Sequence, residues 1–191
     1  MQYVGIDLET TGLDPDNCQV VELGAVIDDL KTPLHQLPKF RYRVKEPCYR
    51  GEPYALSLHA DLFREIAAHR DDPDNFDDND VIDSEDHLTF WFAEWLKKNG
   101  VDGCNFVAAG QNFANFDALF LRLLPKSDRI KWHHRVLEAG PMFVRATDKF
   151  LPDTMTCVQR AGIDISDIPG KPHTAIYDIL VTCALIRSRI V

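Results

Sequence analysis

Residues 4–12 read VGIDLETTG, and this stretch decides the fold that the sequence predicts. Apolar side chains occupy every second position up to Leu8, which is the period of a β-strand. Asp7 and Glu9 then lie together on the other face of that strand, about 7 Å apart along the chain. Gly12 and the Asp14-Pro15 pair mark a turn. The stretch therefore predicts a strand with one apolar face and two carboxylates on the opposite face.

Two further strands follow, and helices alternate with strands in the rest of the chain. Residues 20–28 and 39–45 have strand patterns. The remaining predicted elements are a short helix within 55–69, a helix from about Asp83 or Ser84 to Lys98, a strand at 105–111, a helix at 114–124, a strand at 131–137, and helices at 153–161 and 174–190. The acidic run at 70–80 lacks the glycine and terminal glutamate of a calcium loop, so we interpret it as a solvated loop. The order predicts an α/β fold with a mixed sheet, in a single domain over residues 1–191.

Composition and charge narrow the classes of protein that fit. No apolar run approaches the roughly 20 residues that span a bilayer, and the N-terminus lacks a secretory pattern, so we expect a cytoplasmic protein without a membrane partner. The five cysteines are scattered without a C-x-x-C pair, which argues against zinc and redox sites. A net charge of −9 counts against a broad basic surface for duplex nucleic acid. The same net charge is compatible with a nucleic-acid end that is held mainly through bound cations.

The two carboxylates of the first strand are suited to a hard cation. Asp7 and Glu9 repel each other on a buried strand unless a cation lies between them, and such cations prefer oxygen ligands. The alternative is an edge strand with a solvated polar face, which the strongly apolar surroundings disfavour. A D-x-[DE]-x-T pattern also opens aspartyl-phosphate phosphatases of the haloacid dehalogenase type. Their second acid is usually aspartate and they carry a late acidic pair, which this chain lacks.

Two later motifs supply more acids and a histidine. Residues 110–117 read GQNFANFD, which places Asp117 early in a helix, just beyond a buried strand. Ligands collect at such strand ends, although an acid there also stabilises a helix dipole. Residues 172–178 read PHTAIYD, and five helical positions separate side chains by roughly 140°. His173 and Asp178 therefore converge only if the histidine lies on the loop before the helix.

Together the three motifs resemble the DEDDh branch of the proofreading-type, ribonuclease T-like 3′–5′ exonucleases. The first matches D-x-E-T-T-G, and the third matches His-x-Ala-x-x-Asp, which distinguishes the histidine branch from the tyrosine branch. The second matches Asn-x-x-Phe-Asp with one extra residue between Asn112 and Phe116. Gln111 departs from many relatives, which have histidine there. The motifs span residues 7 to 178, and the resemblance implies a ribonuclease H-like fold.

The resemblance also implies a site and a reaction. It assigns four acids to a centre of two Mg²⁺ or Mn²⁺ ions: Asp7, Glu9, Asp117 and Asp178. It makes His173 the general base, and it implies substrate contacts from Thr10, Thr11, Gly12, Leu13 and Asn112. The expected substrates are 3′ ends of single-stranded DNA or RNA, because base stacking is tolerant of sequence. Homodimers are common in parts of the superfamily.

Two other classes of function stay open at this point. One is a nucleic-acid-binding module that keeps the fold without activity, and the loss of a metal-binding acid would favour it. No acid of the set is missing. The other is the phosphatase, which predicts a covalent phosphate on Asp7. An exonuclease forms no such intermediate.

Overall fold

Six strands form one mixed sheet in the computed structural model, which describes residues 1–71 and 81–190. The strands are β1 (Tyr3–Thr10), β2 (Val20–Asp28), β3 (Lys39–Val44), β4 (Val81–Asp83), β5 (Ala108–Gly110) and β6 (Leu137–Glu138). Their order across the sheet is β4-β3-β2-β1-β5-β6. The β1–β2 and β2–β3 pairs are antiparallel, and the other pairs are parallel. The predicted α/β fold with a mixed sheet is confirmed.

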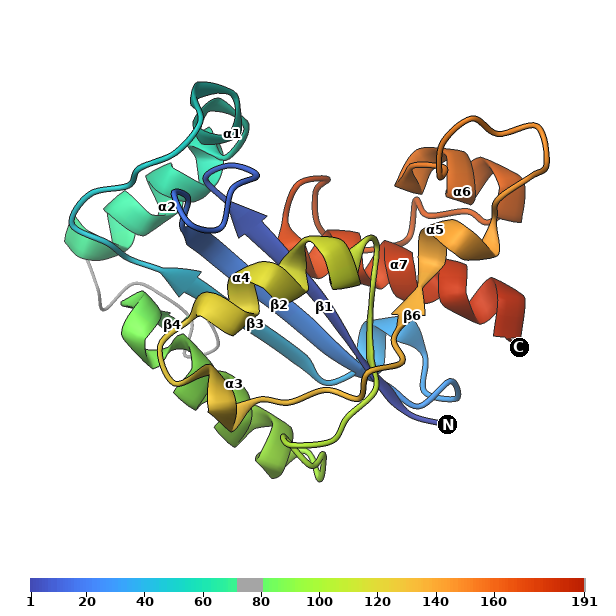
Figure 1. The fold of residues 1–191 in the computed structure, drawn as a ribbon, viewed down its shortest axis with the longest axis horizontal. Coiled ribbons are helices and arrows are strands. Elements are labelled where there is room, and N and C mark those ends of the chain that lie inside the picture. The colour runs from blue at the N-terminus through green and yellow to red at the C-terminus, as the bar shows by residue number, and fades with distance from the viewer. Residues whose placement is uncertain (72–80, 191) are drawn as a thin grey trace.

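Helices cover both faces of this sheet (Figure 1). The α-helices are α1 (Pro53–Leu58), α2 (Ala60–Asp71), α3 (Glu85–Lys98), α4 (Asp117–Leu123), α5 (Ala139–Met142), α6 (Thr154–Ala161) and α7 (Ala175–Ile190). Short 3-10 turns are η1 (Leu34–Gln36), η3 (Phe113–Asn115) and η4 (Ser127–Arg129). No helix within the described ranges combines the length and the apolar character that crossing a bilayer requires.

The alternation along β1 decides which side chains face which helices. Val4, Ile6 and Leu8 are buried in the core that also contains the apolar faces of α3 and α4. Gly5 faces α7, where a Cβ atom would lie only 2.8 Å from the Ile179 side chain. The positions that follow Gly5 on this face carry the two carboxylates of β1. The period of the strand thus directs its acids towards α7.

Most of the predicted elements are confirmed, and the reasons are local. β2 has the predicted bounds, and β3 and α6 differ from theirs by one residue. The Ser84 hydroxyl accepts a hydrogen bond from the Asp86 amide at 3.2 Å, which fixes the start of α3. α7 begins one residue after the predicted start. Capping residues and strand periodicity are encoded within a few positions, so the sequence predicts them well.

Two predictions about the fold are confirmed only in part. The strand predicted at 131–137 is limited to a bridge between Phe106 and Trp132 and to β6, which begins at the last residue of this segment. β5 offers just three residues for pairing, so the apolar segment beside it has little backbone to pair with. The short helix within 55–69 is instead two helices, α1 and α2, which meet at His59. Residues 72–80, most of the predicted acidic loop, lie outside the described residues.

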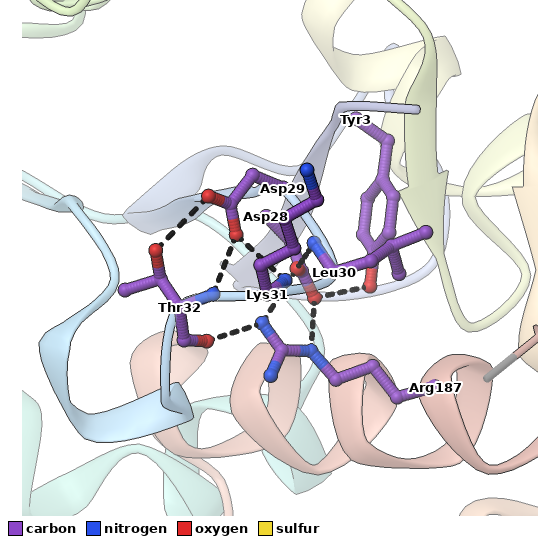
Figure 2. Close-up of polar contacts among 7 residues, drawn as sticks. All are labelled: Tyr3, Asp28, Asp29, Leu30, Lys31, Thr32 and Arg187. Atoms are coloured by element: carbon purple, nitrogen blue, oxygen red, sulfur yellow. Dashed lines mark hydrogen bonds and ion pairs between the residues drawn. The ribbon is translucent and has the colours of Figure 1, made fainter.

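A buried ion pair fastens α7 to the turn after β2 (Figure 2). Asp28 accepts hydrogen bonds from Arg187 Nε at 2.9 Å and Nη2 at 2.7 Å, and from the Tyr3 hydroxyl at 2.6 Å. Arg187 also donates to the Thr32 carbonyl at 2.7 Å. The Asp28 side chain is fully buried, so its charge depends on these partners. This pair holds the C-terminal half of α7 in register with the sheet.

The N-terminal end of α7 lies directly on β2. A Cβ atom at Gly24 would come within 2.6 Å of the Ala175 backbone, so only glycine permits this close approach. The buried Glu22 carboxylate accepts a hydrogen bond from the Ala175 amide at 3.0 Å. These contacts place the first turn of α7 next to the acids of β1.

Candidate metal centre and active site

Three carboxylates converge where the first turn of α7 passes β1. Asp7 and Glu9 come from alternate positions of β1, and Asp178 comes from the first turn of α7. One oxygen from each of them lies within 4.8 Å of the others. Oxygen atoms at such separations can share one divalent cation. The structure therefore joins the first and third sequence motifs in one cluster.

The fourth acid, Asp117, lies beside β1 and outside this group of three. It is the first residue of α4 and is buried. Its Oδ1 accepts a hydrogen bond at 2.9 Å from the amide of Leu8, the residue between Asp7 and Glu9 in the sequence. This bond fixes the position of the Asp117 carboxylate beside β1. Its charge contributes to the raised pKa of Asp7. Asp117 therefore lies next to the segment of β1 that carries the two strand acids, without being one of the three convergent ligands.

His173 lies on the loop before α7, as its convergence with Asp178 requires. Its backbone is left-handed, with φ of 63°, and its amide donates to Asp178 Oδ2 at 3.0 Å. The Thr174 hydroxyl donates to the Lys171 carbonyl at 2.7 Å and tightens the same loop. The imidazole is exposed. Asp178 thus holds the backbone of the histidine while the ring stays open to solvent.

Burial and mutual repulsion raise the pKa values of the acids. Burial raises the pKa of Asp7 most, followed by the charges of Asp117, Glu9 and Asp178. Burial, followed by Asp178 and Glu22, raises the pKa of Glu9 to about 9. Burial also raises the pKa of Asp117 to about 7 and that of Asp178, which the His173 amide partly opposes. A bound cation would reverse this preference for the neutral acids.

The donor atoms fit a hard divalent cation. Glu9 Oε1 is buried and accepts no hydrogen bond from the residues that the structure describes. A buried carboxylate oxygen without a donor is costly unless an ion is bound to it. The three convergent ligands are all carboxylates, which suits Mg²⁺ or Mn²⁺ better than a softer metal. We conclude that these residues can hold such an ion.

His59 is a neighbour of this centre that the sequence analysis missed. It lies between α1 and α2, is buried, and places Nε2 3.5 Å from Glu9 Oε2. Burial lowers its pKa, the charge of His173 lowers it further, and a hydrogen bond to the Thr10 carbonyl opposes both. The residue belongs to the least regular stretch of the sequence and to none of the motifs. Only the tertiary structure, which brings the junction of α1 and α2 next to Glu9, reveals it.

Both threonine hydroxyl groups at the turn after β1 donate hydrogen bonds to backbone carbonyl groups of the protein. The Thr10 hydroxyl donates to the Gly12 carbonyl at 2.8 Å. The Thr11 hydroxyl donates to the Arg50 carbonyl at 2.6 Å. The Leu13 side chain, in contrast, is 73% exposed. The threonines therefore shape the turn, and Leu13 is the side chain that projects from it.

Asn112 does not line the cavity that contains Asp7 and Asp178. Asp7, His173 and Asp178 line a cavity of ≈ 380 Å³. Asn112 lines another, of ≈ 310 Å³, and Gln111 contributes to both. Asn112 has a left-handed φ of 66° and begins η3. The structure thus places Gln111 closer to the acids than the predicted substrate contact Asn112.

Removing divalent cations is expected to make the protein less stable at higher pH. The folded-state pKa values of Glu9 and Asp117 are about 9 and about 7. Unfolded carboxyl groups have values of about 4. The folded protein then binds more protons than the unfolded chain between these limits, so these acids lower the free energy of unfolding as the pH rises. We expect a lower melting temperature in EDTA at pH 8 than at pH 5.

Adding Mg²⁺ or Mn²⁺ at pH 8 should restore this stability. A cation at about 100 times its Kd contributes about 2.7 kcal/mol, which is about 5–10 °C for a chain of this size. Thermal melts at pH 5 and pH 8, with EDTA or with Mn²⁺, measure the difference. The Asp16→Asn variant, altered at an exposed acid, should behave as wild type. Equal cation stabilisation at both pH values would contradict the raised pKa values.

The fold is similar to that of solved exonuclease I structures. The moderately thermophilic exonuclease I from Methylocaldum szegediense has a TM-score of 0.63 and 16% identity, over 98% of this chain and 40% of its own. A structure of exonuclease I that suggests how processivity is achieved has a TM-score of 0.62 and 16% identity, over 99% of this chain and 41% of its own. Exonuclease I with bound product has a TM-score of 0.61 and 14% identity, over 96% of this chain and 42% of its own.

This likeness is one of three-dimensional structure. No family model matches the sequence, and neither does any curated protein. The chain spans about two fifths of the length of these exonuclease I chains. It has their ribonuclease H-like fold, with a mixed sheet flanked by helices.

Proposed function

We propose that this chain is a metal-dependent 3′–5′ exonuclease of the DEDDh type, acting on single-stranded DNA or RNA. The observation that carries the proposal is the meeting of Asp7, Glu9 and Asp178 beside His173, in the fold of exonuclease I. These residues come from both ends of the chain. A buried group of like charges is unfavourable for stability, and such groups are typical of functional sites.

The acids would hold two divalent ions. Asp7, Glu9 and Asp178, whose oxygens converge, would hold one ion, and Asp7 together with Asp117 would hold the other. When bound, the ions would supply charge stabilisation for the attacking and the leaving oxygens of an in-line displacement. In the reaction, a water oxygen bonds to phosphorus and the bond to the 3′ oxygen breaks, which releases a 5′-mononucleotide.

His173 would accept the proton of the attacking water. His173 is exposed and lines the same cavity as Asp7 and Asp178, and the hydrogen bond from its amide to Asp178 keeps the loop in place. Histidine suits this task because its charge changes near neutral pH. The turn at residues 10–13 would receive the terminal nucleotide, with the exposed Leu13 side chain against its base. Few contacts of this kind suffice for a single-strand end.

Digestion of labelled oligonucleotides tests the proposal. We expect wild type to shorten 5′-labelled single-stranded DNA or RNA from the 3′ end with Mg²⁺ or Mn²⁺, and not with EDTA. Replacing His173 by alanine should lower the rate about 10²- to 10³-fold, because the general base is lost. His134→Ala is the matched control, since this histidine is exposed and lines a different cavity from that of Asp7 and Asp178. The polymer that is shortened at the higher rate, DNA or RNA, is the preferred substrate.

Three results would overturn the proposal in different ways. Binding without shortening, by folded and metal-loaded protein, would indicate a nucleic-acid-binding module instead. Transfer of phosphate to Asp7, detected by mass spectrometry, would indicate an aspartyl-phosphate phosphatase. Cleavage that starts inside a circular single strand would indicate an endonuclease.

A further inference from the structure

A third cavity is lined by residues of the loop that carries His173. Its volume is ≈ 570 Å³, and it is formed by β3 together with residues 169–177. Its lining combines three cationic side chains with apolar and aromatic ones: Lys39, Arg41, Lys171, Leu37, Ile176 and Tyr177. Cavities of this size accommodate a nucleotide. The chain as a whole has a net charge of −9, so a cavity lined by three cationic side chains differs in charge from the rest of the protein.

The register of the sheet relates this cavity to the acid cluster. Asp7 pairs with Gly24 on β2, and Gly24 pairs with Arg41 on β3. Paired residues point to the same face of a sheet, so Arg41 lies on the same face as Asp7. Two strand spacings separate their backbones by about 10 Å. A short oligonucleotide spans this distance.

The cations of the cavity are held in position by other groups. The Lys39 ammonium donates to the carbonyl groups of His35 at 2.8 Å and Leu37 at 3.4 Å. Arg41 forms ion pairs with Glu22 and Glu65. Lys171 is exposed. Two anchored cations and one exposed cation form a site that is largely organised before an anion arrives.

Glu65 is the acidic side chain that lines this cavity, and it also pairs with Arg43 at 2.8 Å. The buried Arg43 guanidinium therefore offsets much of its charge. Glu22 and Glu65 likewise offset the charge of Arg41, so the positive excess facing the cavity comes from Lys39, which donates to neutral carbonyl groups, and from Lys171. Tyr177 lines both this cavity and the one with the three acids, so the two sites are neighbours.

We propose that this cavity binds one nucleotide unit through its phosphate. The phosphate lies among Lys39, Arg41 and Lys171, and the base packs on Ile176 and Tyr177. The nucleotide is either part of the substrate strand upstream of the cleaved bond, which rests on the proposed function, or a free mononucleotide. Both have the same chemistry at this site, and binding measurements separate them.

Binding without hydrolysis tests this site. Fluorescence anisotropy of labelled oligothymidylates in EDTA compares wild type with Lys39→Gln, Lys171→Gln and the double variant. We expect each substitution to weaken binding about tenfold, as expected for a lost charged hydrogen bond. The dependence of log K on log salt should become shallower by about 0.7 for each lysine. Lys98→Gln, at an exposed lysine in the last turn of α3, is the matched control and should bind as wild type.

Competition identifies the source of the phosphate. Thymidine 5′-monophosphate and inorganic phosphate are titrated against the same proteins by calorimetry. Weaker oligonucleotide binding in the lysine variants supports the upstream nucleotide, whereas loss of monophosphate binding alone supports the free nucleotide. Wild-type affinity for every probe in the double variant would overturn the site. Because EDTA prevents metal-dependent hydrolysis, this result is independent of whether the protein proves to be an exonuclease.

Discussion

Replacing Asp7 by asparagine is expected to lower the rate of 3′ end shortening on the order of 10³- to 10⁴-fold while the protein stays folded. The Asp7 carboxylate converges with those of Glu9 and Asp178, and Asp117 is bound to the amide of the next residue, Leu8. Asparagine keeps the shape of the side chain and removes the charge that a shared cation needs. The rate is measured with saturating Mn²⁺, so that weaker binding of the ion does not limit it.

The same substitution should stabilise the protein in EDTA at pH 8. Removing one carboxylate relieves the repulsion that raises the pKa values of its neighbours. We therefore expect a higher melting temperature than wild type in EDTA and a smaller gain on adding Mn²⁺. Asp16→Asn carries the same charge change at an exposed site and should leave the rate and both melts unchanged. Full activity of Asp7→Asn would refute the metal centre.

Replacing Arg187 by methionine is expected to lower the free energy of unfolding by about 3–5 kcal/mol. The substitution leaves the Asp28 carboxylate buried without its charged partner (Figure 2). Only the hydrogen bonds from Tyr3 and the Leu30 amide would remain on this group. Urea unfolding measured in EDTA gives the change. A loss below 1 kcal/mol would show that water replaces the guanidinium.

A double-mutant cycle separates the ion pair from lost packing. Asp28→Asn removes the buried charge and keeps an oxygen that accepts the hydrogen bond from Tyr3. We expect the double variant with Arg187→Met to be more stable than Arg187→Met alone, because no charge is then left without a partner. Additive losses would instead mean that the arginine acts mainly through its apolar contacts.

These two predictions concern the acid cluster, to which the first turn of α7 contributes Asp178, and the ion pair formed near the other end of the same helix. Arg187 ties the last turns of α7 to the turn after β2, and the first turn of α7 carries Asp178. Gly24 lets the helix approach the sheet between these points. The position of Asp178 relative to β1 is therefore set by packing along the whole helix. If loss of the ion pair destabilises the packing of α7 enough, cation binding by Asp178 should also weaken.

Much of the site could be predicted from the sequence because its determinants are local. The period of β1 sets Asp7 and Glu9 on one face, and the structure has them there. The position of His173 before α7 and of Asp178 within it follows from their spacing on a helix. The bounds of β2 and the cap of α3 likewise depend on neighbouring residues. The sequence by itself determined the elements and the faces on which these acids lie.

Other features exist only once distant segments meet. The bond from the Ala175 amide to Glu22 joins residues 153 positions apart, and that between Arg187 and Asp28 joins residues 159 apart. His59 reaches Glu9 only because the chain folds so that the junction of α1 and α2 lies next to β1, and the cavity with Lys39 needs β3 beside the loop before α7. Local sequence does not encode such contacts, since they arise from the packing of surfaces that many sequences share. The tertiary structure alone decided which charges are buried together and which surround a cavity.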